Sequence, residues 1–456
     1  MTMGAIDQYL ELWCQNKALI ESKSSAPLNG LRENAAKSLR EHPLPDTKSE
    51  DYAHTDMESV LAPDFGVNVA RIPFRVNPAE SFRCDVPHLS TSLFLIVNDE
   101  FAGTAGCRDM LPEGIEVKSL AAYAKENPEF VGKYYGRLAN MDNPIVALNT
   151  LLCQDGMVLH VGRGVKVEST IQLVNIFNST SPLLAARRLL IVMEEDSEAK
   201  MLACDHTQSP DTDFCSVQVV EIFAGAGSRL DYYDLEESTE QTRRLSSIYL
   251  RQEENSEVLL DSMTLYNGIT RNEFFADFAG RHARLRMLGM GIEDNQRRLD
   301  TFSRIEHNVP ECNTDELFKY VVEDSAMGAF AGLIYVAEGA TKTEAYQSNR
   351  NLVGSTEARM HSKPQLEIYN DDVKCSHGTA IGQLDEKQLF YMMTRGLSEE
   401  EARLMLKQAF MSDVIDGISL PPLRDRLKLM VERRFAGEKS ACNQCSMHNA
   451  QCTMHN

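Results

Sequence analysis

From about residue 156, the chain alternates between apolar and polar side chains as half-buried strands do. The segments MVLHV and KVESTIQLVNIF carry β-branched residues at alternate positions, with a turn at Gly162 and Gly164 between them. This period of two predicts strands, because the apolar positions of a helix would recur every three to four residues. We therefore expect the chain to change from helices to strands near Gly156.

A small or polar pair precedes several alternating segments at a near-constant spacing. Successive second members of these pairs are 31, 28, 27, 30 and 27 residues apart. The pairs are Asp196-Ser197, Gly227-Ser228, Asn255-Ser256, His282-Ala283, Cys312-Asn313 and Gly339-Ala340. Regular short strands without amphipathic helices between them predict a β-solenoid, whose coils each bury a face against the next. A β-sandwich with irregular spacing is the alternative.

Helical patterns flank the strands on both sides. In the C-terminal part, Ser398 and Glu401 form a capping box, and a second helix starts at Pro421. Two amphipathic helices in so short a stretch cannot bury both apolar stripes by themselves, so they must dock on the body or on a partner. We predict an N-terminal helical region (1–85), a connector with the solenoid core (86–383), a C-terminal helical domain (384–438) and a tail rich in Cys and His (439–456).

Composition and charge exclude several classes of protein. With 46 Lys and Arg against 67 Asp and Glu, the net charge is −21, which argues against nucleic-acid and anionic-membrane partners. No apolar stretch is long enough to span a bilayer, and the first residues do not resemble an export signal. The 11 cysteines are then best explained as reduced thiols, so we expect a cytoplasmic protein. Walker, dinucleotide-binding, nucleophile-elbow and zincin motifs are absent from the sequence.

Cys375 and His377 are the most informative candidate ligands. In a strand, residues two apart share a face, so thiol and imidazole would emerge side by side. Sulfur and nitrogen together suit iron, zinc or an iron–sulfur species. Two ligands cannot close a metal site, so further ligands would have to come from elsewhere or from another chain. On the residue types alone, a buried Cys and a hydrogen-bonded structural His are the more ordinary interpretation.

The tail carries a second set of candidate metal ligands. They follow the pattern C-x2-C-x2-H-x3-C-x2-H at Cys442, Cys445, His448, Cys452 and His455. Such ligands could hold a tetrahedral zinc ion, but zinc modules usually leave a dozen or so residues between their ligand pairs for a small fold. We expect metal binding there to be opportunistic rather than structural.

The stretch from Ala345 to Arg395 resembles the SufB/SufD family of iron–sulfur cluster assembly proteins, the SufD branch in particular. The residues that carry this resemblance are Gln347, Asn349-Arg350-Asn351-Leu352, Lys363-Pro364-Gln365-Leu366-Glu367-Ile368-Tyr369, Asp371-Asp372-Val373-Lys374-Cys375-Ser376-His377-Gly378, Gly382-Gln383-Leu384-Asp385, Leu389-Phe390-Tyr391 and Arg395-Gly396. Thr379-Ala380 is a small departure, because the family more often has Ala-Thr there.

The resemblance implies a right-handed parallel β-helix between helical domains, in a scaffold subunit that is not an enzyme. It implies pairing with a SufB-like paralogue, or with a second copy when that partner is absent. It also implies binding of the ATPase SufC through the C-terminal helices, for which the candidate residues are Phe390, Leu406, Phe410 and Val414. His377 would serve a transient iron–sulfur cluster shared with the paralogue, and no cofactor would be held tightly by the isolated chain.

Two other functions stay open at the level of sequence. A β-helix enzyme acting on polysaccharide needs paired carboxylates, which Asp371 and Asp372 could supply, although such enzymes are typically exported. A metal-storage or sensing protein could act through the tail. The cluster-assembly scaffold is the prediction that we carry forward.

Overall fold

The computed structural model describes residues 4–73, 91–106 and 111–438. The five candidate ligands of the tail (Cys442, Cys445, His448, Cys452 and His455) lie outside the described residues. No helix within the described ranges is both long enough and apolar enough to cross a membrane.

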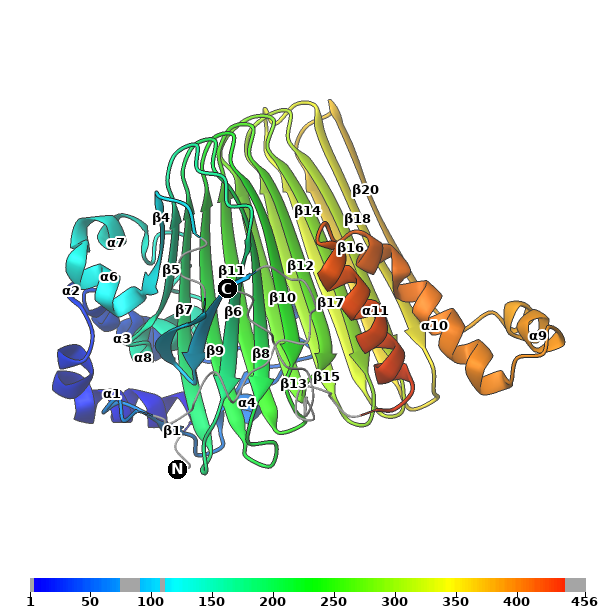
Figure 1. The fold of residues 1–456 in the computed structure, drawn as a ribbon, viewed down its shortest axis with the longest axis horizontal. Helices are drawn as coiled ribbons and strands as arrows, with labels where there is room; N and C mark the ends of the chain where they lie inside the picture. The colour runs from blue at the N-terminus through cyan, green and yellow to red at the C-terminus, as the bar shows by residue number, and fades with distance from the viewer. Residues whose placement is uncertain (1–3, 74–90, 107–110, 439–456) are drawn as a thin grey trace, which may run out of the picture.

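Two facing sheets form the body of the molecule, and from residue 156 onward the chain passes from one to the other at every strand (Figure 1). The odd sheet contains β5 (Gly156–Val161), β7 (Leu183–Met193), β9 (Phe214–Ala224), β11 (Thr242–Gln252), β13 (Ile269–Phe278), β15 (Arg298–His307), β17 (Met327–Val336) and β19 (Arg359–Ile368). The even sheet contains β6 (Thr170–Phe177), β8 (Glu198–Thr207), β10 (Arg229–Glu237), β12 (Glu257–Tyr266), β14 (Arg284–Glu293), β16 (Asn313–Val322), β18 (Thr343–Val353) and β20 (Val373–Gly382). Within each of these two series, neighbouring strands run parallel, as successive coils of a solenoid must.

The predicted β-solenoid with helices at both ends is therefore confirmed, and the β-sandwich alternative is wrong. The right-handed sense of the coils stays an expectation of the resemblance. Short additional strands extend the sheets where the solenoid begins: β1 (Gly66–Val67) pairs with β7, β4 (Ile115–Ser119) with β5, and β2 (Thr91–Val97) with both β6 and β3 (Glu100–Gly106).

The first three predicted spacings match the register of the even sheet. The Cα partners Glu198, Arg229, Glu257 and Arg284 are 31, 28 and 27 residues apart. The last two predicted spacings are wrong, because Arg284 pairs with Asn313 and Asn313 pairs with Glu344, which gives 29 and 31. The turn before β18 is longer than the sequence pairs suggested.

The repeated pairs mark a backbone requirement at the turn into each even strand from β8 to β18. One residue of each turn is left-handed, with φ between 56° and 65°. These residues are Asp196, Gly227, Asn255, His282, Glu311 and Lys342. Gly, Asn and Asp enter this conformation most easily, which explains why the first three turns were recognised correctly. Glu311 and Lys342 give no such compositional signal, and here the predicted pairs miss the register.

The main apolar core lies between the two sheets, where every second side chain of a strand points inward. Leu189, Ile222, Leu260 and Phe318 are among its buried members. Because each coil contributes residues to the same column, burial extends from one coil to the next along the solenoid.

Helices of the first 152 residues form a layer on the outer face of the odd sheet. The helices are α1 (Ala5–Ser22), α2 (Ala26–Asn29), α3 (Arg32–Glu41), α4 (Met57–Leu61), α6 (Leu120–Glu126), α7 (Pro128–Tyr134) and α8 (Pro144–Leu152), together with the single turn η1 (Glu50–Tyr52). Trp13, Leu39 and Leu148 pack in one buried cluster with outward side chains such as Val217 of β9 and Leu245 of β11. The last three helices, α6 to α8, belong to the stretch that the sequence analysis assigned to the connector.

The C-terminal helices are α9 (Glu386–Thr394), α10 (Glu399–Asp416) and α11 (Pro421–Phe435). All of α11 and the second half of α10 lie across the outer face of the even sheet. There Met411 and Leu427 pack against Met263 and Leu288 (Figure 1). The predicted capping box of Ser398 and Glu401 begins α10. In contrast, α9 and the start of α10 extend away from the body as a projecting arm, residues 386–405 (Figure 1). At Lys407 the helix is back at the body, where the ammonium pairs with Glu323 at 2.9 Å.

Candidate functional site

The last coil, formed by β19 and β20, differs from the coils before it. Eight of the nine residues of β10 are buried, whereas β20 and β19 contain no buried residue. Both strands also end their sheets: among the described residues, β19 pairs along its length only with β17, and β20 only with β18. Each therefore keeps a free backbone edge of the kind that readily pairs with another strand.

Cys375 and His377 lie on β20 and point to the same side, as their spacing predicts. Their Cα partners on β18 are Ala345 and Gln347, which are both buried inside the solenoid. Tyr346 lies between these partners and is exposed on the outer face, and its own partner on β20 is Ser376. Cys375 and His377 therefore face the interior at its open end, where no further coil covers them.

The two side chains have different surroundings. Cys375 is half-buried against a small apolar cluster that includes Ile334 and Leu366, and this burial raises the pKa of its thiol. A raised pKa keeps sulfur protonated, and a protonated thiol is a poor ligand and nucleophile. His377 is exposed, and neither ring nitrogen has a hydrogen-bond partner within the described residues. Of the two candidates, His377 is the one free to bind something else.

A chain of hydrogen bonds joins both walls of the solenoid beside His377. Thr379 of β20 donates to the hydroxyl of Ser362 of β19 at 2.6 Å, and Ser362 donates to Asn349 Oδ1 of β18 at 2.6 Å. The amide of Asn351 donates to the same oxygen at 2.7 Å. The sequence analysis listed Asn349 and Asn351 only as part of a motif. Their inward direction follows from the coil register, which the motif alone does not reveal.

The described residues contain no group of three or more His, Cys, Asp and Glu side chains that could hold a metal ion. Asp371 and Asp372 lie in the exposed turn between β19 and β20, where the Asp372 carbonyl accepts a hydrogen bond from the Lys342 amide. Within the described residues, the last coil therefore does not close a metal site by itself, and a ligand role for His377 stays a prediction.

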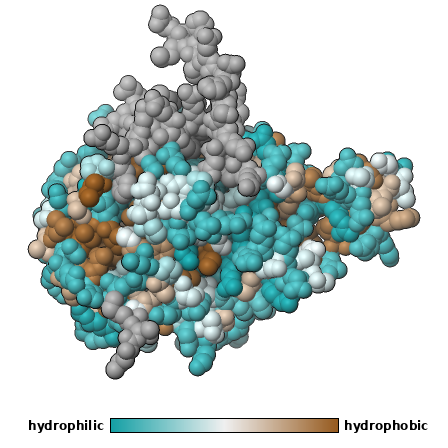
Figure 2. Space-filling view, turned by 90° about the horizontal axis from the view of Figure 1, so that it is seen from below, coloured by the Kyte–Doolittle hydropathy of each residue, from teal (hydrophilic) through white to brown (hydrophobic). Residues whose placement is uncertain are grey.

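The four predicted ATPase-docking residues fall in three environments. Phe390 is 68% exposed on α9, where Tyr391 and Met393 are exposed beside it. Leu406 is half-buried, and Phe410 packs against the cluster under α10, with the Lys319 ammonium over its ring. Val414 is fully buried against the even sheet, where it anchors α10 to the body, so its side chain is not exposed to a partner in this chain and its docking role stays a prediction. Figure 2 shows apolar surface on the projecting arm.

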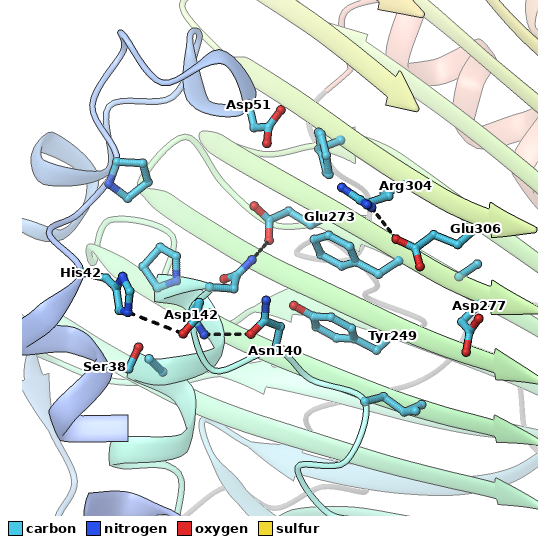
Figure 3. A pocket seen from close by; sticks show the side chains of 18 of the residues that line it. Ser38, His42, Asp51, Asn140, Asp142, Tyr249, Glu273, Asp277, Arg304 and Glu306 are labelled. Carbon is cyan, nitrogen blue, oxygen red and sulfur yellow. Dashed lines mark hydrogen bonds and ion pairs between the residues drawn. The ribbon is translucent and has the colours of Figure 1, made fainter. Parts of the chain in front are cut away.

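A hollow of about 830 Å³ lies between the N-terminal helical layer and the outer face of β11, β13 and β15 (Figure 3). Tyr249 and Phe275 stack on its floor with ring centroids 4.6 Å apart. Most charges around the floor are paired within the chain: Arg304 with Glu306 at 2.6 Å, Arg251 with Asp277, and His42 with Asp142. Paired charges of both signs do not select one class of ligand, and we assign this hollow no function.

Comparison with known protein families agrees with the arrangement of the fold. A model described as "SUF system FeS cluster assembly, SufBD core domain" matches residues 175–410, and one described as "SufBD protein N-terminal region" matches residues 3–173. The chain belongs to the SufBD family. The resemblance stated from the sequence is confirmed, and the core match spans β6 to α10, including the last coil and the projecting arm.

Individual relatives narrow the assignment within the SufBD family. An iron–sulfur cluster assembly SufBD family protein of Synechocystis sp. is 28% identical over 437 residues, which are 94% of this chain and 96% of the relative. The iron–sulfur cluster assembly protein SufD of Escherichia coli is 33% identical over 184 residues, 40% of this chain and 44% of the relative. SufD of Bacillus subtilis is 22% identical over 77% of this chain and 80% of the relative. The chain is a SufD-like member of a family of the SUF cluster-assembly system.

Proposed function

We propose that the chain is a scaffold subunit that supports nascent iron–sulfur cluster formation without turnover of its own. In this proposal its last coil pairs with a SufB-like paralogue, its projecting arm binds the ATPase SufC, and His377 contributes to a transient cluster at the paired edge. The cluster is cargo shared between chains, and the isolated chain holds none tightly. A cytoplasmic location agrees with the six described cysteines, which are all free thiols.

The observation that carries the proposal is the unpaired double edge of β19 and β20. A protein that keeps two adjacent, uncovered strand edges risks pairing at random, unless a partner normally covers them. Exposed apolar side chains at these strands, Ile368 and Ile381, are suited to burial in such an interface. His377 lies on the same strand as Ile381, so pairing along this edge brings ligands of the second chain to it.

Co-purification of the tagged chain from its own cells tests the pairing directly. We expect a SufB-like paralogue and a SufC-like ATPase in the complex. Replacing Ile368 and Ile381 together by Asp should remove the paralogue and keep the ATPase. Ile72→Asp, on an equally apolar side chain that is 67% exposed in the N-terminal part, is the matched control and should remove neither. Retention of the paralogue by the double variant would contradict pairing at this edge.

The same edge should pair two copies of the chain when the paralogue is absent. Sedimentation of the purified chain at micromolar concentration should then show a dimer, and the Ile368→Asp, Ile381→Asp variant should be a monomer. A wild-type chain that is strictly monomeric and also fails to bind the paralogue would overturn the proposed interface.

The projecting arm is tested by substituting its exposed aromatic residues. Phe390→Asp with Tyr391→Asp should abolish ATPase binding and leave the melting temperature unchanged, because both side chains are exposed. Leu429→Asp, an exposed apolar position of α11, is the control and should retain the ATPase. Unchanged affinity in the double variant would place the docking surface elsewhere.

The role of His377 is tested by iron and sulfide per folded complex after reconstitution. His377→Ala should lower the cluster content and leave the stability of the chain almost unchanged, since the imidazole is exposed at the open end of the solenoid. Cys375→Ser should have the smaller effect, because its thiol is held protonated in an apolar cluster. Full cluster content with both residues replaced would exclude the ligand role.

A further inference from the structure

Three inward-facing side chains form one rung that leads from the interior to the candidate ligand. Glu316 of β16 is the Cα partner of Gln347 of β18, and Gln347 is the Cα partner of His377 of β20. Glu316 and Gln347 are 1% and 3% exposed, whereas His377 is exposed at the open end. Neighbouring parallel strands lie about 4.8 Å apart, so each side chain of the rung is within reach of the next.

The amide of Gln347 has a defined orientation. Its Nε2 donates to Glu316 Oε2 at 2.6 Å, and a carboxyl oxygen there accepts whether Glu316 is ionised or not. Burial raises the pKa of Glu316 to about 7, so both forms occur near neutral pH. With Nε2 turned toward Glu316, the amide oxygen Oε1 is left as a buried acceptor without a partner among the described residues.

The opposite wall of the solenoid leaves room for this amide. A Cβ at Gly332 of β17 would lie 2.3 Å from Gln347 Nε2 and 2.8 Å from the ring of Phe330. Only a glycine therefore lets the Gln347 amide lie across the interior in its present place. Gly328 faces inward on the same strand, but a Cβ there would meet Met360 instead. The two glycines provide a matched pair of positions for substitution.

An unsatisfied buried carbonyl oxygen beside a histidine selects one form of the ring. It can accept only from a ring N–H, which leaves the other ring nitrogen without a proton and able to bind a metal. Histidines that ligate metals almost always donate their second nitrogen to such an acceptor, which fixes both tautomer and ring direction. Gln347 is the side chain of the rung that can supply this acceptor to His377.

We propose that Gln347, oriented by Glu316 and accommodated by Gly332, is a positioning residue that accepts a hydrogen bond from His377 and directs the bare imidazole nitrogen out of the open end. The inference rests on the proposed function in one respect: the bare nitrogen would face iron or a cluster brought by the paired chain. In the structure the imidazole does not make this bond, so the proposal turns the exposed ring of His377 inward to Gln347 Oε1, a movement that requires no partner chain.

Nitrogen NMR of the isolated chain, labelled at histidine, tests the positioning without any metal. At pH 8 we expect His377 to occupy one neutral tautomer, with its signal assigned by its disappearance in His377→Asn. Gln347→Leu removes the acceptor at similar size and should return His377 to the mixed tautomers of a free imidazole. Gly332→Ala displaces the amide and should do the same, whereas Gly328→Ala should leave the His377 signal unchanged. Each variant is first checked for a cooperative melting transition.

A mixed tautomer in the wild type, or a single tautomer that survives Gln347→Leu in folded protein, would overturn the inference. Iron per folded complex provides the second measurement, in which Gln347→Leu should weaken iron binding about tenfold or more. If the tautomer is fixed and released as expected but His377→Ala leaves the cluster content unchanged, the proposed function fails while the positioning stands. The two failures are therefore distinguishable.

Discussion

The middle coils and the last coil are built from the same repeat but have opposite environments. In β10 to β12, inward side chains are covered by neighbouring coils, and outward ones by α10, α11 or the N-terminal layer. In β19 and β20 no residue is buried, and the outer backbone edge of each strand is unpaired within the described residues. The interior of the solenoid is open at this end. The difference suggests that stability comes from the middle of the solenoid and that binding is left to its end.

Charges illustrate the same contrast. Inside the middle coils, Arg244 forms ion pairs with Asp234 at 2.6 Å and Asp205 at 3.2 Å, and all three are buried. In the last coil, Lys374 pairs with Glu344 at 2.7 Å, but the lysine side chain is 73% exposed. Buried charges depend on each other because neither can be hydrated, while an exposed pair loses little when it separates.

The largest expected effect comes from comparing the loss of a buried cation with the loss of an exposed one. Arg244→Ala should lower the free energy of unfolding by about 3–5 kcal/mol, because it leaves the buried Asp234 without its cation and leaves Asp205 with Arg187 alone. Lys374→Ala, the matched change in the last coil, should leave the free energy of unfolding almost unchanged, because solvent already screens this exposed pair. Urea denaturation followed by circular dichroism measures both. Similar losses in the two variants would refute the division between a stabilising middle and a binding end.

The next largest effect is a pH dependence of stability, which a buried histidine of the middle coils should cause. His307 of β15 is buried inside the solenoid, its Nε2 lies 2.9 Å from Thr314 Oγ1, and burial lowers its pKa to about 3. Because the unfolded chain binds this proton near pH 6.5 and the folded chain does not, stability falls as the pH drops below 6.5. Between pH 6.5 and 5 the loss is about 2 kcal/mol from this residue.

His307→Gln should therefore reduce the loss of stability between pH 7 and pH 5. Denaturation midpoints of the wild type and of His307→Gln at both pH values provide the comparison. An equal loss of stability in the wild type and in His307→Gln would show that other titratable groups cause the acid sensitivity.

The sequence predicted the solenoid because its periodic turns are constrained by the backbone. Asp196, Gly227 and Asn255 occupy left-handed positions that few residue types tolerate, so their spacing is visible in the composition. The same strand pattern placed Cys375 and His377 on one face, as the structure has them. The rung of Glu316 and Gln347 was not predicted, because its register crosses a turn that is longer than its neighbours. Counting 31 residues from Glu316 and 30 from Gln347 would have revealed it.

The docking residues show where pattern alone fails. Val414 continues the apolar stripe of α10, and the stripe does not tell which of its residues the body already covers. Val414→Ala should cost about 1–2 kcal/mol of stability through two lost methyl groups under α10. Phe390→Ala, on the projecting arm, should cost almost nothing, because its ring is exposed. Thermal melting of the two variants measures the difference, and equal losses would mean that α9 also packs on a covered surface.

The smallest effect on stability is expected from the tail, residues 439–456, which carries candidate Cys and His ligands of its own. Deleting residues 439–456 should leave the melting temperature of the chain unchanged, since this stretch contains no Leu, Ile, Val, Phe, Tyr or Trp to bury. The full chain should take up Zn²⁺ from a weak chelator through Cys442, Cys445, His448, Cys452 and His455, and the deletion variant should take up none at these positions. Cys442→Ser with Cys445→Ser is the matched control that keeps the tail length. Cluster content per folded complex should not change in either variant if binding is confined to the last coil, and a fall in both would add the tail to the assembly site.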